Sequence, residues 1–386
     1  MSPTVKADVG RLTPPDDAPV AELVAGLRTF GLRLMASQPA ELNLVVSPAS
    51  IALAFAMVEA GASASTSADI RRALALPAPP GLHGATNALS VRLDAVRREG
   101  VTLDVANAIW GQVGLPLGAG FLASIASHYG AGVATVDFAA DPELARQEIN
   151  RWVADVTRER IPELFPARMI DVDTMFAVVN AVYLDAAWHT PFDESRTLDL
   201  PFTLTDGSSA DVATMHNARL STRAAVEPDH SAVRLPYEGG DLAMVVLVPA
   251  GSTTLAAFEA SLTGERLAAI VAGLGHDVVD LSLPRWDIGT ALDLGPPLSE
   301  LGLRIPGGDL SGMAPDALIG AAVHAANITV DEKRTVAAAA TGVVAGRTGM
   351  PPPPLRIAVD RPFLFVVQHE ATGAPLFIGR VTDPRT

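Results

Sequence analysis

The stretch of sequence that decides the fold lies near the C-terminus, from Val330 to Pro384, and reads VDEKRTVAAAATGVVAGRTGMPPPPLRIAVDRPFLFVVQHEATGAPLFIGRVTDP. Its four consecutive alanines would by themselves predict a helix, because alanine is the best helix former. The flanking residues indicate otherwise. The residues ITVDE read as a strand that ends at Glu332, and VDRPF, FLFVVQHE and PLFIGRV read as further strands. The alanine run therefore links two strands.

Upstream, the order of elements predicts an α+β fold. Apolar residues recur at helical spacing from Val20 to Phe30, and further helical patterns follow at about residues 48–60, 66–75, 84–98, 118–129 and 141–157. From Met175 the apolar residues form short runs typical of strands, MFAVVNAVYL, AVRLPY, LAMVVLVP and VVDLSLP. Because helices and strands are segregated along the chain, we expect antiparallel or mixed sheets.

Composition excludes several classes of function. The 386 residues are 49% hydrophobic, enough for one large domain or two ordinary ones. A net charge of -15 argues against a nucleic-acid partner, because phosphate binding needs clustered Lys and Arg. The absence of Cys excludes disulfides, thiol catalysis and thiolate metal sites. Arg greatly outnumbers Lys and Ala is abundant, which is typical of a GC-rich bacterial genome.

The N-terminal residues predict a flexible arm over 1–19, since prolines interrupt it and no apolar segment of a secretory signal follows the start. The most apolar run, residues 51–60, reaches Glu59 long before the roughly 20 residues that span a membrane. We therefore expect a soluble protein without a membrane partner, cytoplasmic or exported by another route.

Signatures of catalysis and of metal binding are missing. The chain has no GxSxG, HExxH or GxxxxGK motif, and its eight His residues never recur at the i, i+4 spacing of a helical metal site. We expect no metal and no cofactor. A Ser-His-Asp triad built from distant positions remains open, because triads are defined by geometry and not by sequence order.

A second informative segment, NLVVSPASIALAFAMVEAGASASTSADIRRAL, runs from Asn43 to Leu74. Ser47 reads as a helix N-cap, and Pro48 occupies the first helical position, where its missing N–H costs nothing. This pattern fits an ordinary capped helix. It also resembles the shutter segment of the serpin family.

Three more segments carry the resemblance to serpins. The segment VVNAVYLDAAWHTPFDESRTLDLPF, from Val178 to Phe202, is similar to the family's central strand, with Asn180 and Trp188 at its shutter and breach landmarks. The segments LPYEGGDLAMVVLVP and LSLPRWDIGTALDLGPPLSELGL follow in the family's order, and the final stretch looks like its reactive loop and C-terminus.

The resemblance implies a single serpin domain over residues 20–386. Its N-terminal half would be mostly helical, and it would contain a large central mixed sheet, further antiparallel sheets and an exposed reactive loop at about residues 333–355. Ser47, Ser50, Asn180 and His324 would form a polar cluster beneath the main sheet, which must satisfy its own hydrogen bonds. Alternatively, each of the four satisfies only a neighbouring backbone group.

The resemblance further implies a serine protease inhibitor that acts as a suicide substrate. A protease cleaves the loop and is held as an acyl ester, and the cleaved loop enters the main sheet as a new central strand. The implied hinge comprises Glu332, Lys333, Arg334, Thr335, Val336, Ala337, Ala338, Ala339, Ala340 and Thr341.

The loop residues suit this mechanism. No proline, which would remove a ladder donor, stands between Thr335 and Met350, and the first side chains are small. The segment Pro351–Pro354 could not join a central strand, so cleavage should precede Met350. About a dozen inserted residues at roughly 1 kcal/mol per net hydrogen bond would release on the order of 10 kcal/mol. The uninserted state is therefore expected to be metastable.

Two bonds compete as the reactive bond. Counting forward from Glu332 by the family's spacing selects Thr348–Gly349, and counting back from VDRPF selects Arg347–Thr348. We favour Arg347–Thr348, because a guanidinium can pair with the buried carboxylate of a trypsin-like pocket. The expected partner is a trypsin-like or subtilisin-like serine protease, and the inhibitor is expected to be a monomer.

One residue departs from the inhibitory pattern. Inhibitory serpins usually have Gly where this chain has Arg334, and Gly permits backbone angles that Arg resists. A non-inhibitory serpin, cleaved as a substrate and serving a binding or chaperone-like role, is therefore the alternative. A hydrolase with an unrecognised triad is a third interpretation.

Overall fold

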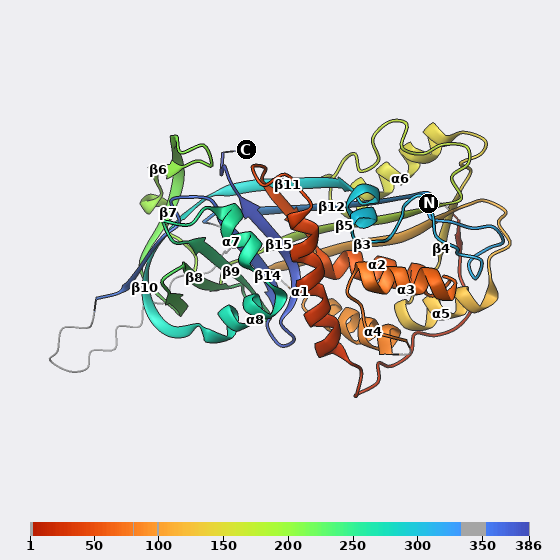
Figure 1. Ribbon diagram of the computed structural model, residues 1–386, viewed down its shortest axis with the longest axis horizontal. Helices are drawn as coiled ribbons and strands as arrows, with labels where there is room; N and C mark the ends of the chain where they lie inside the picture. Colours follow the sequence, from red (N-terminus) through yellow and green to blue (C-terminus); the bar gives the residue numbers. More distant parts are fainter. Residues whose placement is uncertain (1–2, 80, 99, 333–352, 386) are drawn as a thin grey trace.

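Two β-sheets packed against a buried helix make up the body of the protein (Figure 1). The structure is a computed structural model, and it describes residues 3–79, 81–98, 100–332 and 353–385.

The first sheet has six strands in the order β1-β4-β3-β5-β12-β11. Their bounds are Thr4–Val5 (β1), Val133–Val136 (β4), Val101–Gln112 (β3), Phe176–Ala186 (β5), Ala321–Val330 (β12) and Trp286–Asp293 (β11). β5 is parallel to β12 and β3 is parallel to β4, whereas the β3/β5 and β11/β12 pairs are antiparallel. The expected mixed sheet is confirmed.

The second sheet has nine strands in the order β13-β10-β7-β8-β9-β14-β15-β2, with β6 paired to β7. The bounds are Leu355–Ala358 (β13), Gly275–Pro284 (β10), Ser209–Val226 (β7), His230–Pro236 (β8), Leu242–Pro249 (β9), Phe363–His369 (β14), Ala374–Val381 (β15), Leu44–Val46 (β2) and Leu198–Thr203 (β6). Among these strands only the β10/β13 pair is parallel. The further antiparallel sheets that we expected are joined in this one sheet.

The helices of the first half lie where their periodicity predicts. They are Val20–Ala36 (α1), Pro48–Glu59 (α2), Ala64–Ala73 (α3), Gly81–Asp94 (α4), Ala119–Tyr129 (α5) and Pro142–Val156 (α6). Three more helices follow in the second half, Leu255–Ser261 (α7), Gly264–Gly273 (α8) and Gly295–Glu300 (α9), and a 3₁₀ turn lies at Glu194–Arg196. The sequence analysis missed β3 and the long β7, because polar side chains interrupt the alternation of both strands.

Helix α2 forms the centre of the core. Ser47 caps it by accepting a hydrogen bond from the Ser50 N–H at 3.3 Å, and all residues from Pro48 to Glu59 are buried. A helix that is apolar on every side is expected to be buried. Accordingly, α2 contacts β3 and β5 of the six-stranded sheet and β15 of the other. The opposite face of the six-stranded sheet packs against α6, where Ile149 and Val153 join a second buried cluster.

The N-terminal arm is attached to this body. Thr4 and Val5 pair with β4, and the Leu12 N–H donates to the Ser127 carbonyl at 2.7 Å. The proline pattern indicated a flexible arm over residues 1–19, whereas the structure ties residues 3–12 to neighbouring elements. Backbone hydrogen bonds to an edge strand leave little trace in a side-chain pattern, which is why the sequence did not reveal them. The arm's flexibility in solution stays a prediction.

Candidate functional site

The predicted reactive loop joins the two sheets. The described chain continues from the end of β12 to Glu332 and resumes at Pro353, just before β13. β12 belongs to the six-stranded sheet, and β13 forms an edge of the other. Lys333 to Thr341 of the predicted hinge and the predicted bond Arg347–Thr348 lie outside the described residues.

At the end nearest the predicted loop, the ladder of paired residues between β5 and β12 ends before either strand ends. Its pairs run from Ala177/Ala321 to Leu184/Ile328. Beyond that point, two more residues of β5 pair with β3, and two more residues of β12 pair with β11. The two strands therefore part at the end where the loop departs from β12.

The directions of the two strands suit the entry of a third between them. Because β5 and β12 are parallel, a segment that turns back after β12 runs antiparallel to both. Its entry would replace one parallel ladder by two antiparallel ladders, which are slightly more stable per residue. A segment entering on the other side of β12 would instead run parallel to β11. Topology therefore favours the boundary between β5 and β12.

A chain of buried polar side chains crosses this boundary on the α2 side. Asn180 and His324 face each other across the β5/β12 ladder, and Nδ1 of His324 is hydrogen-bonded to Oδ1 of Asn180. Nε2 of His324 accepts from the Ser47 N–H at 3.1 Å, and Nδ2 of Asn180 donates to Oγ of Ser50. The structure thus brings the four predicted cluster residues into contact.

Asn107 of β3 is a fifth member, which the sequence analysis missed. Its Oδ1 accepts from the Ser50 hydroxyl at 3.0 Å and from Nδ2 of Asn180, its partner across the β3/β5 ladder. An asparagine within the run VANAIW could have been noticed, because a polar group in an apolar run needs a partner. The strand itself went unpredicted, so the residue was not considered.

His324 is held in its neutral form. Complete burial lowers the pKa of His324 to about 3, because desolvation disfavours the imidazolium ion. The hydrogen bonds agree with this. Nε2 accepts the Ser47 N–H and so carries no proton, while Nδ1 carries the proton directed at Asn180. A proton on Nε2 would remove the acceptor that the Ser47 N–H uses. The hydrogen bonds seen at the β5/β12 boundary therefore require a neutral imidazole.

Trp188 lies at the loop end of the same boundary. Its indole N–H donates to the carbonyl oxygen of Asp331 at 2.9 Å, and its ring stacks on Tyr237 with centroids 4.6 Å apart. Only 3% of Trp188 is exposed. The residue that directly follows β12 is therefore fixed to a buried aromatic pair.

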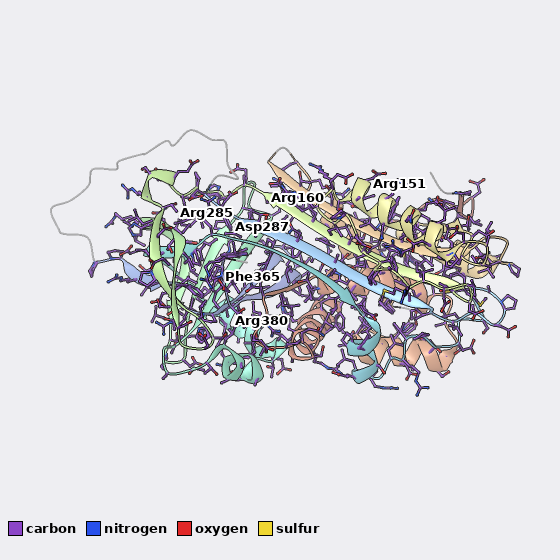
Figure 2. All side chains as sticks on the ribbon, turned by 90° about the horizontal axis from the view of Figure 1, so that it is seen from above. Arg151, Arg160, Arg285, Asp287, Phe365 and Arg380 are labelled. Carbon is purple, nitrogen blue, oxygen red and sulfur yellow. The ribbon has the colours of Figure 1, made fainter. Side chains whose placement is uncertain are left out.

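Glu332, the first predicted hinge residue, is buried as well. One of its carboxylate oxygens accepts from the Thr197 hydroxyl, and the other lies 3.4 Å from Nε of Arg285. Arg285 and Asp287 lie near this end of β12 (Figure 2). A cavity of about 310 Å³ adjoins Glu332, lined also by Glu194, Thr197, Arg285 and Asp331. The loop thus begins from an anchored carboxylate.

Within the described ranges, no helix has both the length and the apolar character that a membrane span requires. The described side chains also contain no group of three or more His, Asp or Glu residues placed to hold a metal ion.

Comparison with known proteins places this arrangement in a family. The serpin family, described as serine protease inhibitors, matches residues 25–384. The leukocyte elastase inhibitor of Bos taurus is 35% identical over 354 residues, which cover 89% of this chain and 93% of that protein. Iripin-2 of Ixodes ricinus is 32% identical over 372 residues, covering 94% of this chain and 93% of that protein.

Solved structures agree with the sequence relatives. The native state of the thermophilic serpin tengpin superposes with a TM-score of 0.84 at 25% identity and covers 98% of this chain and 97% of its own. Uncleaved ovalbumin has the same fold, with a TM-score of 0.82 at 24% identity over 94% of this chain and 100% of its own. On its sequence match, its relatives and its fold, the chain belongs to the serpin family of serine protease inhibitors.

Proposed function

We propose that this protein traps a serine protease as a suicide substrate, with Arg347–Thr348 as the reactive bond. One observation carries the proposal. The parallel strands β5 and β12 pair directly, their ladder ends before the strands do, and the predicted loop departs from that end. A strand can enter there without reversing the direction of either neighbour.

The reaction begins as ordinary proteolysis. The serine hydroxyl of the protease attacks the carbonyl carbon of Arg347, the bond to Thr348 breaks, and the amino group of Thr348 leaves with a proton. The protease then remains attached to Arg347 as an ester. Insertion of the segment from Lys333 to Arg347, about 50 Å long when extended, would drag the protease along the sheet. Distortion of its oxyanion hole or of its histidine would block hydrolysis of the ester.

The choice of a trypsin-like target rests on Arg347. A guanidinium fits a pocket with a buried carboxylate, which an elastase lacks. Several relatives are named leukocyte elastase inhibitors, so an elastase is the alternative target. We favour a trypsin-like protease over an elastase because the residue before the reactive bond, Arg347, would enter the specificity pocket of the protease.

The experiment mixes the purified protein with trypsin and, separately, with an elastase. We expect a denaturation-resistant complex with trypsin. We also expect a released peptide whose mass identifies Thr348 as its first residue. Arg347→Ala should abolish this complex, and the matched control Arg356→Ala, on β13, should retain it.

Other products would point to other functions. Cleavage to fragments without a complex would identify a substrate-type serpin, the alternative to which Arg334 points, because Arg resists backbone angles that Gly permits. Ester turnover by an uncut chain would identify a hydrolase. A peptide that begins at Gly349 would move the reactive bond to Thr348–Gly349.

A further inference from the structure

The N-terminal arm covers a strip of surface, the arm site, formed by β4, α4 and the end of α5. The Pro3 carbonyl accepts from the Thr135 N–H at 2.9 Å and from the Thr135 hydroxyl at 3.0 Å. Thr4 and Val5 pair with β4 on the edge that β3 leaves open. The ammonium group of Lys6 donates to the Gly130 carbonyl at 2.6 Å. The arm thus adds a short strand to the six-stranded sheet.

A buried amide on α4 recognises the next part of the arm. Asn87 is fully buried, and its Nδ2 donates to the Leu12 carbonyl at 2.9 Å. Its Oδ1 accepts from Nε of Arg11 at 2.9 Å. Both ends of the amide therefore bond to the arm, one to its backbone and one to its arginine. A buried amide that lost these bonds would leave polar groups unsatisfied.

A glycine lets the arm backbone approach β4 closely. A Cβ atom at Gly132 would lie 2.6 Å from the Val5 carbonyl oxygen and 2.9 Å from Cγ2 of Thr4. The first distance is to backbone, which cannot move aside as a flexible side chain can. Any side chain at Gly132 would therefore push β1 away from β4.

The arm is held mainly by polar contacts. Val5, Val9 and Leu12 are 41%, 43% and 53% exposed, so a large part of their apolar surface stays in water. The ion pair between Arg11 and Asp94, at 3.5 Å and partly exposed, adds little. Backbone hydrogen bonds and one recognised arginine therefore provide most of the affinity. A segment held in this way should dissociate and rebind readily.

We propose that this arm site is a peptide-binding site whose exchangeable occupant is the chain's own arm. An extended peptide binds by strand addition to the β4 edge, and Asn87 selects an arginine at the position of Arg11 in that peptide. The tether gives the chain's own arm an effective concentration on the order of millimolar, so the arm of each copy normally occupies the arm site of the same copy. The proposal is independent of protease inhibition.

The test separates the arm from the folded protein. A specific endoprotease site introduced between Asp16 and Asp17, both exposed in a turn, allows the folded chain to be cut there. We expect native mass spectrometry to show the fragment of residues 1–16 still bound. A fluorescent peptide of residues 1–16 should then replace it saturably. The uncut chain should bind that peptide at least about tenfold more weakly, because its own arm competes.

Two variants in the arm site test its location. Gly132→Ala and Asn87→Ala should each weaken peptide binding by about tenfold or more, the loss expected when one or two hydrogen bonds are removed. Gly120→Ala is the matched control, because nothing lies within 4 Å of its added Cβ. In the peptide, Arg11→Ala should weaken binding and Val9→Ala should not.

Hydrogen exchange gives a second readout in the uncut chain. The Thr135 amide, which donates to Pro3, should exchange faster in Gly132→Ala, while amides of β5 keep their protection. Immediate release of the fragment without binding of the labelled peptide would overturn the proposal. Equal binding by Gly132→Ala and Gly120→Ala would overturn it as well, because the arm would then be held elsewhere.

Discussion

His324 is completely buried and hydrogen-bonded to Asn180 across the β5/β12 boundary, so we expect the stability of the protein to depend on pH. In the unfolded chain its pKa is near 6.5, and burial in the closed sheet lowers the pKa to about 3. Between these values the unfolded chain binds a proton that the folded one does not. Its contribution to stability is therefore complete above about pH 6.5 and is lost progressively as the pH falls toward 3.

We expect the free energy of unfolding to fall by about 2 kcal/mol more between pH 7.5 and pH 5 in the wild type than in His324→Gln. Urea unfolding at the two pH values measures the difference. The pKa values of His128 and His369 are also lowered by burial, so the wild type has a further slope that the variant shares. Equal slopes in the two proteins would show that the buried imidazole does not govern this acid sensitivity.

Asn107 is the second residue whose replacement we expect to matter. Asn107→Leu removes the acceptor shared by Ser50 and Asn180, so their buried donors lose a partner. The free energy of unfolding should drop by about 1–3 kcal/mol. Asn217→Leu, on the half-exposed strand β7, is the control and should change stability by less. Urea unfolding at pH 7.5 compares them, and similar values for both variants would exclude a contribution from the cluster.

At the scale of elements, the rate at which the cleaved loop enters between β5 and β12 is expected to decide whether the protease is trapped or released. After acylation, insertion competes with hydrolysis of the ester, so slower strand entry diverts the reaction to hydrolysis. Thr335→Arg would bury a charge at the start of the new strand, and Ala339→Pro would remove a ladder donor. Both should turn the inhibitor into a substrate without changing which bond is cut.

The yield of denaturation-resistant complex and the mass of the released peptide test this prediction. Ala339→Ser, which stays small and keeps its N–H, should retain the complex. A full yield from Thr335→Arg or Ala339→Pro would mean that insertion of the hinge does not trap the protease.

At the scale of the whole molecule, the six-stranded sheet is expected to gain a strand when the loop is cut. Cleavage within residues 343–350 should raise the melting temperature, since about a dozen residues gain ladder bonds worth roughly 1 kcal/mol each. Calorimetry of intact and cleaved protein measures the change. Cleaved Ala339→Pro should gain much less, and equal melting of intact and cleaved wild type would exclude insertion.

The sequence by itself determined the helices of the first half, several of the strands and the family. Periodicity located the helices from α1 to α6, because an apolar stripe every 3.6 residues records which face is buried. It also located β5, β8, β9, β14 and β15 as apolar runs. The Ser47 cap could be predicted for a similar reason, since a cap and its helix are neighbours in the chain. Asn180 and His324 were identified only through the resemblance to serpins.

Tertiary structure decided which of these elements meet. His324 faces Asn180 from 144 residues away, and the Trp188 indole reaches Asp331 across 143 residues. A period of two shows that a strand has two faces, but it does not identify the neighbouring strand or the register. Asn107 joined the cluster, and Asn87 met the arm, only through such pairings. These contacts depend on how the sheets and α2 pack together, and no local pattern encodes that packing.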